Sequence, residues 1–333
     1  MTRSLDVTAL VDAAAIPDDN PEFLVDTSVP MTERDVTQAL RELGHRVRVF
    51  GVGDDVGGVV AELSAHRPDV VFNLTEQFRD DRWLDKNVVW LLEMMRIPFT
   101  GTGSAGLLLA RDKGLCKQLL SFHRIRFPSF IVVPPGKNPR APKRMCFPLV
   151  VKPTLEDGSD GISLASVVRD EGELRERVRF VHEHWHQVAI AEEYIEGREL
   201  YVGVLGNRRL KVLPPRELVF GERSAERPAI ATSRVKSDAE YRRKWKIEYR
   251  FAELPVELDD RVARISKRVY RVLQIRDYAR IDLRLTEAGA VHFLEANPNP
   301  DIASGEDFAE AAAKAGIPYN RLIDRLLRLA LSQ

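Results

Sequence analysis

The segment YARIDLRLT at residues 278–286 is followed by VHFLEANP at residues 291–298, and together they predict a β-hairpin. The turn between the two arms falls at Ala288 and Gly289. The strands of a hairpin pair antiparallel. The C-terminal part of the chain is therefore expected to contain an antiparallel sheet.

Four polar side chains of this hairpin can meet on one face. Alternate residues of a strand point the same way, so Arg280 and Asp282 share a face, and so do Glu295 and Asn297. If the two faces coincide, two carboxylates and an amide oxygen converge beside a guanidinium. Such oxygen ligands suit Mg²⁺, and the arginine would neutralise phosphate. A surface ladder of ion pairs fits the same spacing, but the Pro-rich turn at residues 297–300 favours a site.

A second polar stretch begins at Lys152, which ends an apolar run. A lysine in this position is partly buried and needs an anionic partner. The residues that follow, EDGSDG at 156–161, include Ser159 and can present backbone N–H groups to phosphate. The ending of a P-loop is missing, and the same loop also fits an ordinary turn.

A third stretch, AEEYIEGRE at residues 191–199, places acidic residues at the end of an apolar strand. Glu192 and Glu199 could accept hydrogen bonds from an adenine amine and from ribose hydroxyls. The alternative interpretation is a solvated acidic face.

The first hundred residues alternate strands with helices, which predicts a parallel sheet covered on both faces, a Rossmann-like arrangement. The glycines within residues 51–58 have the wrong spacing for a dinucleotide fingerprint and are expected only to form a turn. The expected strands are 7–11, 47–52, 69–74 and 97–100, and the expected helices are 32–43, 56–65 and 85–95.

The rest of the chain combines helices with further strands, so the predicted fold class is α/β, with an α+β C-terminal part. The expected helices are 104–122, 170–183, 258–273 and 319–331, and the expected strands are 130–133, 148–151, 188–193, 199–205 and 209–213.

Composition narrows the class of protein. A length of 333 residues suits two or three subdomains. No apolar run reaches the roughly 18 residues of a membrane helix, so no membrane partner is expected. Basic and acidic residues number 50 each, which argues against bulk nucleic-acid binding. The N-terminus lacks a signal-peptide pattern and there are only two cysteines, Cys116 and Cys146, so a cytoplasmic protein is expected.

Taken in order, these segments resemble the ATP-grasp superfamily and, within it, the D-alanine–D-alanine ligase family. No single motif is specific, and the weight lies in their order and spacing. The segments that carry the resemblance are TGTG at 100–103, RDK at 111–113, VKP at 151–153, EEYIEGRE at 192–199, ARID at 279–282 and EAN at 295–297.

The resemblance implies an ATP-grasp fold of three domains. These would be a Rossmann-like domain at residues 1–103, a central domain with a phosphate-covering loop at 104–195, and a C-terminal catalytic domain with the Mg²⁺ site at 196–333.

The resemblance also implies roles for individual residues. For ATP they are Lys113, Lys152 and Ser159 at the phosphates, Glu192 and the backbone of Ile195 at the adenine, and Glu199 at the ribose. For the metal, Mg²⁺ or Mn²⁺, they are Asp282, Glu295 and Asn297. For catalysis they are Arg280 at the acyl phosphate and tetrahedral intermediate, and Lys236 at the γ-phosphate, with Lys244 or Lys246 as alternatives to Lys236.

The implied activity is an ATP-dependent carboxylate–amine ligase. Transfer of the γ-phosphoryl group to a carboxylate makes a mixed anhydride, which an amine then attacks. The implied substrates are small and amino-acid-like, and the implied assembly is a homodimer. An ATP-grasp enzyme with a thiol or hydroxyl acceptor and a non-catalytic ATP sensor are the alternatives.

The substrate half departs from the family pattern. The family's Gly-Gly-x-Ser-x-Glu-type segment after the first strand is absent, and its His-Gly after the third strand is replaced by NLTEQF at residues 73–78. The serine that meets the acceptor's carboxylate aligns with Glu306, although Ser304 is near, and Asp301 replaces a glycine. A carboxylate repels a carboxylate. We therefore expect a product other than D-Ala-D-Ala, from an acceptor that lacks a free carboxylate or is cationic.

Overall fold

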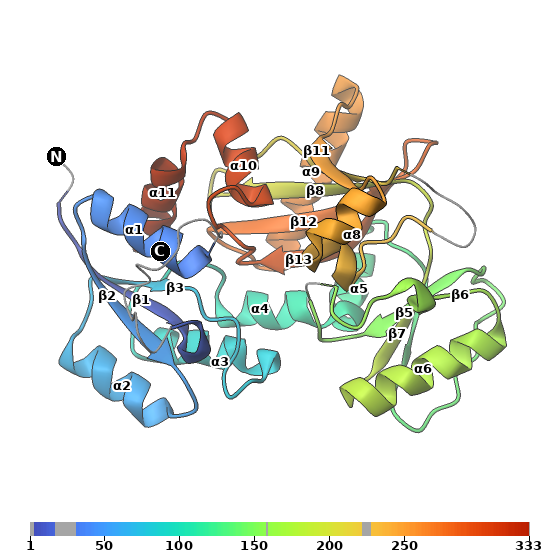
Figure 1. Cartoon of the computed structure of the whole chain (residues 1–333), viewed down its shortest axis with the longest axis horizontal. Coiled ribbons are helices and arrows are strands. Elements are labelled where there is room, and N and C mark those ends of the chain that lie inside the picture. The colour runs from blue at the N-terminus through green and yellow to red at the C-terminus, as the bar shows by residue number, and fades with distance from the viewer. Residues whose placement is uncertain (1–2, 17–30, 158, 222–227, 333) are drawn as a thin grey trace.

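The computed structural model of the chain describes residues 3–16, 31–157, 159–221 and 228–332. These residues form a three-stranded, a four-stranded and a six-stranded sheet, with helices around them (Figure 1). Residue 158, in the loop predicted to cover phosphates, lies outside the described ranges. No helix within those ranges combines the length and apolar character needed to cross a membrane. The predicted fold class, α/β with an antiparallel C-terminal part, is confirmed.

The three-stranded sheet is parallel, with strand order β2-β1-β3. The predicted strand at 97–100 is reduced to one parallel bridge between Phe99 and Val71. Apolar residues on both faces of this sheet are buried, as is expected where helices cover both sides. Its elements are β1 (Asp6–Asp12), α1 (Thr32–Glu42), β2 (Arg46–Val52), α2 (Val56–Ala65), β3 (Val70–Asn73) and α3 (Asp85–Met94).

The four-stranded sheet is antiparallel, with strand order β4-β7-β5-β6, and has a core of its own under α6. Asp170 begins α6 by accepting hydrogen bonds from the backbone N–H groups of Gly172 and Glu173 at 2.7 and 2.9 Å. Its elements are β4 (Phe130–Val133), β5 (Leu149–Pro153), β6 (Val167–Val168), α6 (Glu171–Trp185) and β7 (Ala189–Glu193).

The single helix predicted at 104–122 is wrong. Two helices, α4 (Ser104–Arg111) and α5 (Lys113–Phe122), meet at Asp112, which has extended backbone angles. Its carboxylate accepts hydrogen bonds from the N–H groups of Gly114 and Leu115, both at 2.9 Å, and so caps α5. Lys113 consequently stands in the first turn of a new helix.

The six-stranded sheet is antiparallel along β11-β10-β8-β12-β13, with β9 added to β8. In β12, Ala279, Ile281 and Leu283 are buried in the core shared with α9, so the residues between them face the other way. The elements are β8 (Arg198–Leu205), β9 (Lys211–Val212), β10 (Arg216–Val219), α7 (Ser233–Ser237), α8 (Ala239–Lys244), β11 (Glu248–Phe251), α9 (Val256–Val272), β12 (Tyr278–Leu285), β13 (Val291–Pro298), α10 (Asp307–Lys314) and α11 (Tyr319–Leu331).

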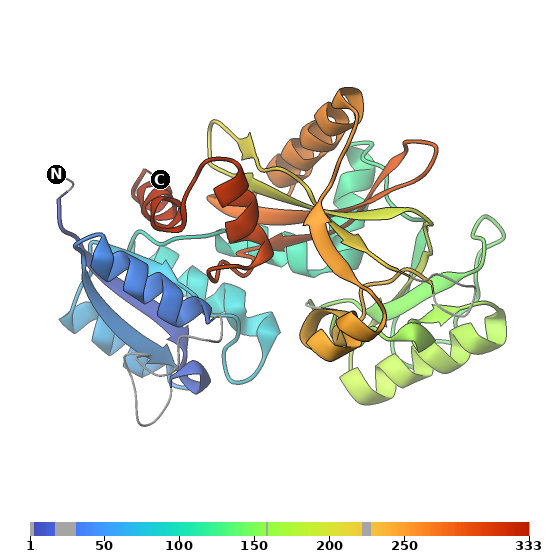
Figure 2. The ribbon, with the colours of Figure 1, turned by 45° about the horizontal axis from the view of Figure 1, so that its top comes forward.

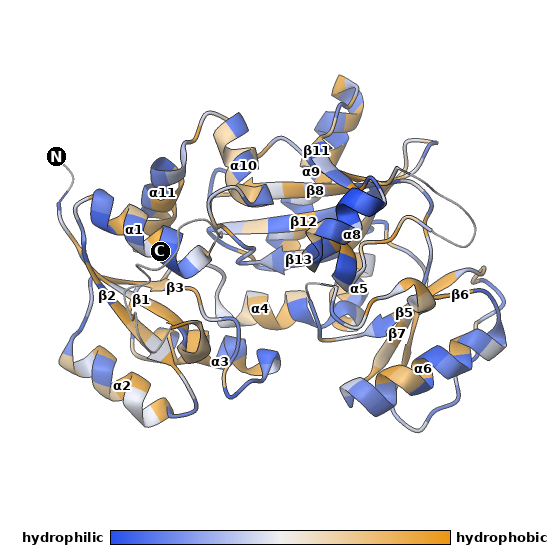
Figure 3. Cartoon of the chain, viewed as in Figure 1, coloured by the Kyte–Doolittle hydropathy of each residue, from blue (hydrophilic) through white to orange (hydrophobic). Residues whose placement is uncertain are grey.

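The first and last parts of the chain share one hydrophobic core. Val36 and Leu40 of α1 are buried in the same cluster as Leu322 and Leu326 of α11, and Figure 2 shows these helices side by side. Helix α8 differs from these two amphipathic helices, because most of its residues, AEYRRK, are charged, and Figure 3 draws most of it as hydrophilic.

The backbone N–H groups of the TGTG segment at 100–103 add hydrogen bonds between the first and last parts of the chain. The N–H of Gly101 donates to the Asp277 carboxylate at 2.9 Å, and the N–H of Thr102 donates to the Asn299 side-chain oxygen at 2.8 Å. Gly101 has a φ of +93°, and a Cβ there would overlap the Asn299 side chain. The segment therefore serves as a joint between the three-stranded and six-stranded sheets.

Candidate active site

The two faces of the C-terminal hairpin coincide, as the sequence hypothesis required. Asp282 stands directly opposite Glu295, and Arg280 stands directly opposite Asn297. Directly opposite residues of an antiparallel pair project to the same side of the sheet. The pairing shifts register just after Asp282, at the end of this polar set.

Asp282 is the centre of this group and is 2% exposed. Its two oxygens accept hydrogen bonds from Nε and Nη2 of Arg280 at 2.8 and 3.0 Å, and from the Asn297 amide at 3.0 Å. Burial raises the pKa of Asp282 to about 6, against the lowering effect of Arg280. Nearby Glu295 also acts to raise the Asp282 pKa, because a second carboxylate disfavours ionisation.

Glu295 has the opposite electrostatic environment. Burial acts to raise its pKa, but the ammonium groups of Lys113, Lys236 and Lys152 outweigh burial and hold the pKa well below its usual range. Three lysines to which the family resemblance assigns the phosphates of ATP thus act on the charge of one predicted metal ligand.

A pocket lies between the four-stranded and six-stranded sheets. The predicted residues that line it are Lys152, Ser159, Glu192, Ile195, Glu199, Lys236, Asp282 and Glu295. The other lining residues are Pro128, Val150, Ile162, Glu193, Tyr194, Ile230, Ala231, Arg284 and Leu294.

The remaining predicted residues lie close to this lining. Arg280 and Asn297 contact Asp282 from the same strand face. Lys113 is 6% exposed and its Nζ donates to the backbone carbonyl of Glu156, in the loop after β5. The structure therefore brings together segments separated by up to half the chain.

Glu192 is held more tightly than the sequence suggested. Its carboxylate forms ion pairs with Nζ of Lys117 at 2.7 Å and with Nζ of Lys152 at 2.9 Å. Lys117 is fully buried, and its Nζ also donates to the backbone carbonyl of Leu294 at 2.9 Å. Sequence reasoning missed Lys117, although it follows Lys113 by four residues and so shares its helix face.

Glu199 is also held by residues that the sequence did not single out. Nη2 of Arg284 bonds to its carboxylate at 2.8 Å, and the Tyr201 hydroxyl donates to it at 2.9 Å. The available signal was the alternation of Arg280, Asp282 and Arg284 along β12, which puts all three side chains on one face.

Of the three candidate lysines in the basic segment, Lys236 lies on the pocket. It belongs to the short helix α7, which begins at Ser233 and is capped by Thr232. Ser233 of the same helix donates its hydroxyl to the Ser159 carbonyl at 2.7 Å, so this helix contacts the loop after β5. Lys244 and Lys246 are not among the lining residues.

Comparison with known proteins agrees with this geometry. A family model described as D-ala D-ala ligase C-terminus matches residues 130–328. An uncharacterized protein of Sinorhizobium fredii is 32% identical over 312 residues, which cover 89% of this chain and 86% of the relative. A D-alanine–D-alanine ligase of Gluconobacter oxydans is 31% identical over 301 residues, which cover 89% of this chain and 92% of the relative.

Among solved structures, a D-alanine–D-alanine ligase of Bacillus anthracis complexed with ATP aligns over 98% of both chains. The TM-score is 0.74 at 22% sequence identity. This likeness establishes the fold, which is the ATP-grasp fold predicted from the sequence.

Proposed function

Because the chain belongs to the D-alanine–D-alanine ligase family, we propose that it is an ATP-dependent ligase that joins a carboxylate to an amine through an acyl phosphate. The observation that carries the proposal is the pocket between two sheets, in which Lys152 and Lys236 converge with the paired carboxylates of Asp282 and Glu295. A carboxylate is a poor electrophile, and phosphorylation converts its oxygen into a leaving group.

The nucleotide is proposed to lie along this pocket. Lys152 and Lys113 would neutralise its phosphates, and Lys236 would reach the γ-phosphate. Glu192 and the backbone of Ile195 would contact the adenine, and Glu199 the ribose. Ser159 would meet the phosphates from the loop after β5. Burial of Lys113 and Lys152 supports the assignment, since buried ammonium groups require anionic partners.

The donor set of the hairpin fits a divalent cation. Among the described residues, no three His, Cys, Asp or Glu side chains converge as a complete metal site. Asp282, Glu295 and the Asn297 amide oxygen would therefore hold Mg²⁺ or Mn²⁺ together with oxygens of the substrates, which is the usual mode for Mg²⁺. When bound, the cation neutralises phosphate charge during phosphoryl transfer.

Arg280 is proposed to act at the reacting carbon. Its guanidinium is oriented by two hydrogen bonds to Asp282 and lies over the Tyr201 ring at 4.9 Å. This fixed, always charged group would bind the oxygens of the acyl phosphate and the developing oxyanion as the amine attacks.

The experiment that tests this proposal is phosphate release from ATP and Mg²⁺ with a panel of amino acids, amino-acid amides and diamines, singly and in pairs. The ligase proposal predicts stimulation by a specific pair, abolished in Asp282→Ala/Glu295→Ala and unchanged in the exposed control Glu257→Ala. Mass spectrometry of the product identifies the acceptor atom. If ATP binds but no carboxylate stimulates release, the proposal fails in favour of a nucleotide sensor.

We also propose that the acceptor lacks a free carboxylate or carries a positive charge, so that the product is not D-Ala-D-Ala. The supporting observation is acidic crowding where the three-stranded sheet meets the loop after β13. Burial and nearby Asp301 raise the pKa of Glu306. Burial likewise raises the pKa of Asp12 to about 6, with Glu33 adding to the effect. A cationic group would be stabilised here and a carboxylate repelled.

Matched pairs of acceptors test this specificity. The proposed preference predicts that D-alaninamide and a diamine stimulate phosphate release more than D-alanine does. Glu306→Ser, which restores the family's residue at the aligned position, should shift the preference toward D-alanine. The specificity proposal is wrong if D-alanine is the best acceptor of the wild-type protein. The domain boundaries after residues 103 and 195 and the homodimer stay predictions.

A further inference from the structure

A cluster of ion pairs outside the pocket bears on the loop after β5. This loop brings Ser159 to the pocket, but Asp157 and Asp160 flank it. If the loop covers the phosphates of ATP, two carboxylates lie near a polyanion. Like charges at short range disfavour binding unless counter-charges neutralise them.

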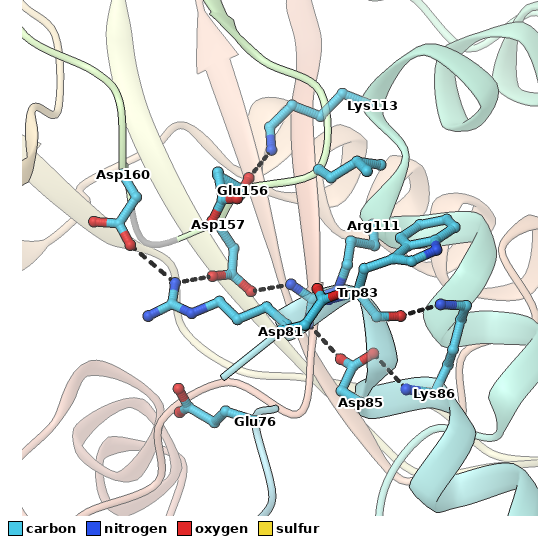
Figure 4. Close-up of polar contacts among 12 residues, drawn as sticks. Glu76, Asp81, Trp83, Asp85, Lys86, Arg111, Lys113, Glu156, Asp157 and Asp160 are labelled. Carbon is cyan, nitrogen blue, oxygen red and sulfur yellow. Dashed lines mark hydrogen bonds and ion pairs between the residues drawn. The ribbon is translucent and has the colours of Figure 1, made fainter. Parts of the chain in front are cut away.

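Arg82 supplies such a counter-charge. Its Nη1 donates to Asp157 at 2.7 Å and to Asp160 at 3.0 Å. One guanidinium therefore links both acidic residues of the loop, which are labelled in Figure 4. Arg82 begins the short 3₁₀ helix η2 (Arg82–Leu84), between β3 and α3, far from the loop in sequence. The contact therefore joins the three-stranded sheet's domain to the loop.

A second arginine anchors the same loop from a more buried position. Nη1 of Arg111, at the end of α4, donates to the other oxygen of Asp157 at 3.0 Å. Nη2 of Arg111 bonds to Asp85 at the start of α3. The side chains of Arg111 and Asp85 are only 11% and 7% exposed, so this pair belongs to the fixed framework.

The Arg82 contacts are more accessible. The exposed fractions are 34% for Arg82 and 43% and 41% for its partners Asp157 and Asp160. Water can replace these bonds without leaving a buried charge, so this contact can open while the Arg111–Asp85 pair stays closed. The loop thus contacts one arginine that is fixed in the framework, Arg111, and one that is more accessible, Arg82.

Arg82 also lies near two acidic residues, Asp12 and Glu76, at the end of the three-stranded sheet. Glu76, in the same connection between β3 and α3, interacts electrostatically with Arg82 and Asp157. The Glu76 side chain reaches solvent, yet partial desolvation by surrounding protein and the charge of Asp157 raise its pKa to about 7. A substrate bound near Glu76 would therefore also lie near Arg82, the residue that holds the loop.

We propose that Arg82 is a positioning residue that neutralises Asp157 and Asp160 and holds the loop after β5 closed over the nucleotide. This inference rests on the proposed nucleotide site. Arg82 acts through the loop and does not contact the reacting atoms. Loss of Arg82 removes the counter-charge of Asp160, leaves Asp157 with Arg111 alone, and releases the loop on one side.

The test measures nucleotide affinity and loop protection in Arg82→Ala. The expected result is about a tenfold increase in the Kd for Mg²⁺ and a non-hydrolysable ATP analogue, with faster proteolysis within residues 154–163. Arg82→Lys, which keeps the charge, should fall between wild type and Arg82→Ala. The matched control is Arg79→Ala, because Arg79 bonds to the Asp54 carbonyl in the same connection and makes no ion pair with the loop.

A second background separates this role from a general loss of structure. In Asp157→Asn/Asp160→Asn, which lacks the charges that Arg82 neutralises, Arg82→Ala should change the Kd less than threefold. An equal loss in both backgrounds would overturn the proposal, as would wild-type affinity in Arg82→Ala. Because the readout is binding, the result is independent of whether any carboxylate stimulates phosphate release. Absence of nucleotide binding in the wild type would refute the proposed function itself.

Discussion

Lys117 and Glu192 form an ion pair of 2.7 Å in which the two side chains are 0% and 4% exposed. Taking both charges out of water is costly, so the pair is stable only because each group has further polar partners. Lys117 also reaches the Leu294 carbonyl, and Glu192 also reaches Lys152. The pair therefore joins α5, β7 and β13 at the back of the pocket.

Replacing Lys117 with methionine is expected to lower the free energy of unfolding by about 3 kcal/mol, because a buried carboxylate loses one of its two counter-charges. Urea unfolding at neutral pH measures the change. The control is Arg328→Met, which removes a 2.8 Å pair whose side chains are 59% and 27% exposed and should cost below about 1 kcal/mol. Equal costs would show that burial adds nothing to the Lys117 pair.

Replacing Asp282 with asparagine is expected to reduce substrate-stimulated phosphate release by about 10²–10³-fold, because a charged group in the active site is lost while its shape is kept. Steady-state kinetics with saturating Mg²⁺ measure the effect. The exposed variant Asp259→Asn should keep wild-type rates. Retention of full activity in Asp282→Asn would exclude this carboxylate as a required ligand.

The stability of the protein should depend on pH through Asp12. Its folded-state pKa is raised from 3.8 to about 6, so folding favours the protonated form. The contribution of Asp12 to stability is therefore fully present below pH 3.8 and is lost as pH rises through 6. Asp12→Asn should gain about 1–2 kcal/mol at pH 8, allowing for its partial exposure, and nothing at pH 3.5. Urea unfolding at pH 3.5 and pH 8 measures the gain in the free energy of unfolding. An equal gain at both pH values would show that it does not arise from the raised pKa of Asp12.

Two glycine substitutions separate steric overlap from backbone strain. Gly101→Ala should cost at least about 2 kcal/mol, because alanine at a φ of +93° is strained and its Cβ overlaps Asn299. Gly136→Ala, at a φ of +78° with no atom within 4 Å of an added Cβ, should cost about 1 kcal/mol from strain alone. Thermal unfolding compares them. Equal costs at the two positions would show that the Asn299 side chain moves aside and that only backbone strain remains.

The sequence was most informative where one regular period dominated. The alternation in residues 278–286 predicted that Arg280 and Asp282 share a face, and the register then placed Asp282 opposite Glu295. The break at Asp112 was missed because apolar residues continue through it at helical spacing, although an aspartate two residues before Gly114 can cap a helix.

Other features could not be predicted from the local sequence, because they depend on residues that are distant along the chain. Within the described residues 214–221 and 228–251, charged side chains hide two strands and two short helices. Strand β10 pairs with β8, β11 pairs with β10, and the apolar side chains of this region pack against Tyr201 of β8. The partners of Lys117, Arg284 and Arg82 are each distant in sequence, so their roles depended on tertiary structure.

The distribution of cores has a mechanical consequence. Among the described residues, the cluster under α6 contains none of the side chains of the core shared by α1 and α11, whereas the joint at Gly101 ties the three-stranded and six-stranded sheets together. The three-stranded and six-stranded sheets therefore form one connected unit, and the four-stranded sheet forms a second unit with its own core. Moving the four-stranded sheet as a unit would leave the core under α6 intact but would break the accessible ion pairs at Arg82 and the buried Lys117–Glu192 pair, so charge pairing rather than a shared apolar core resists such a movement.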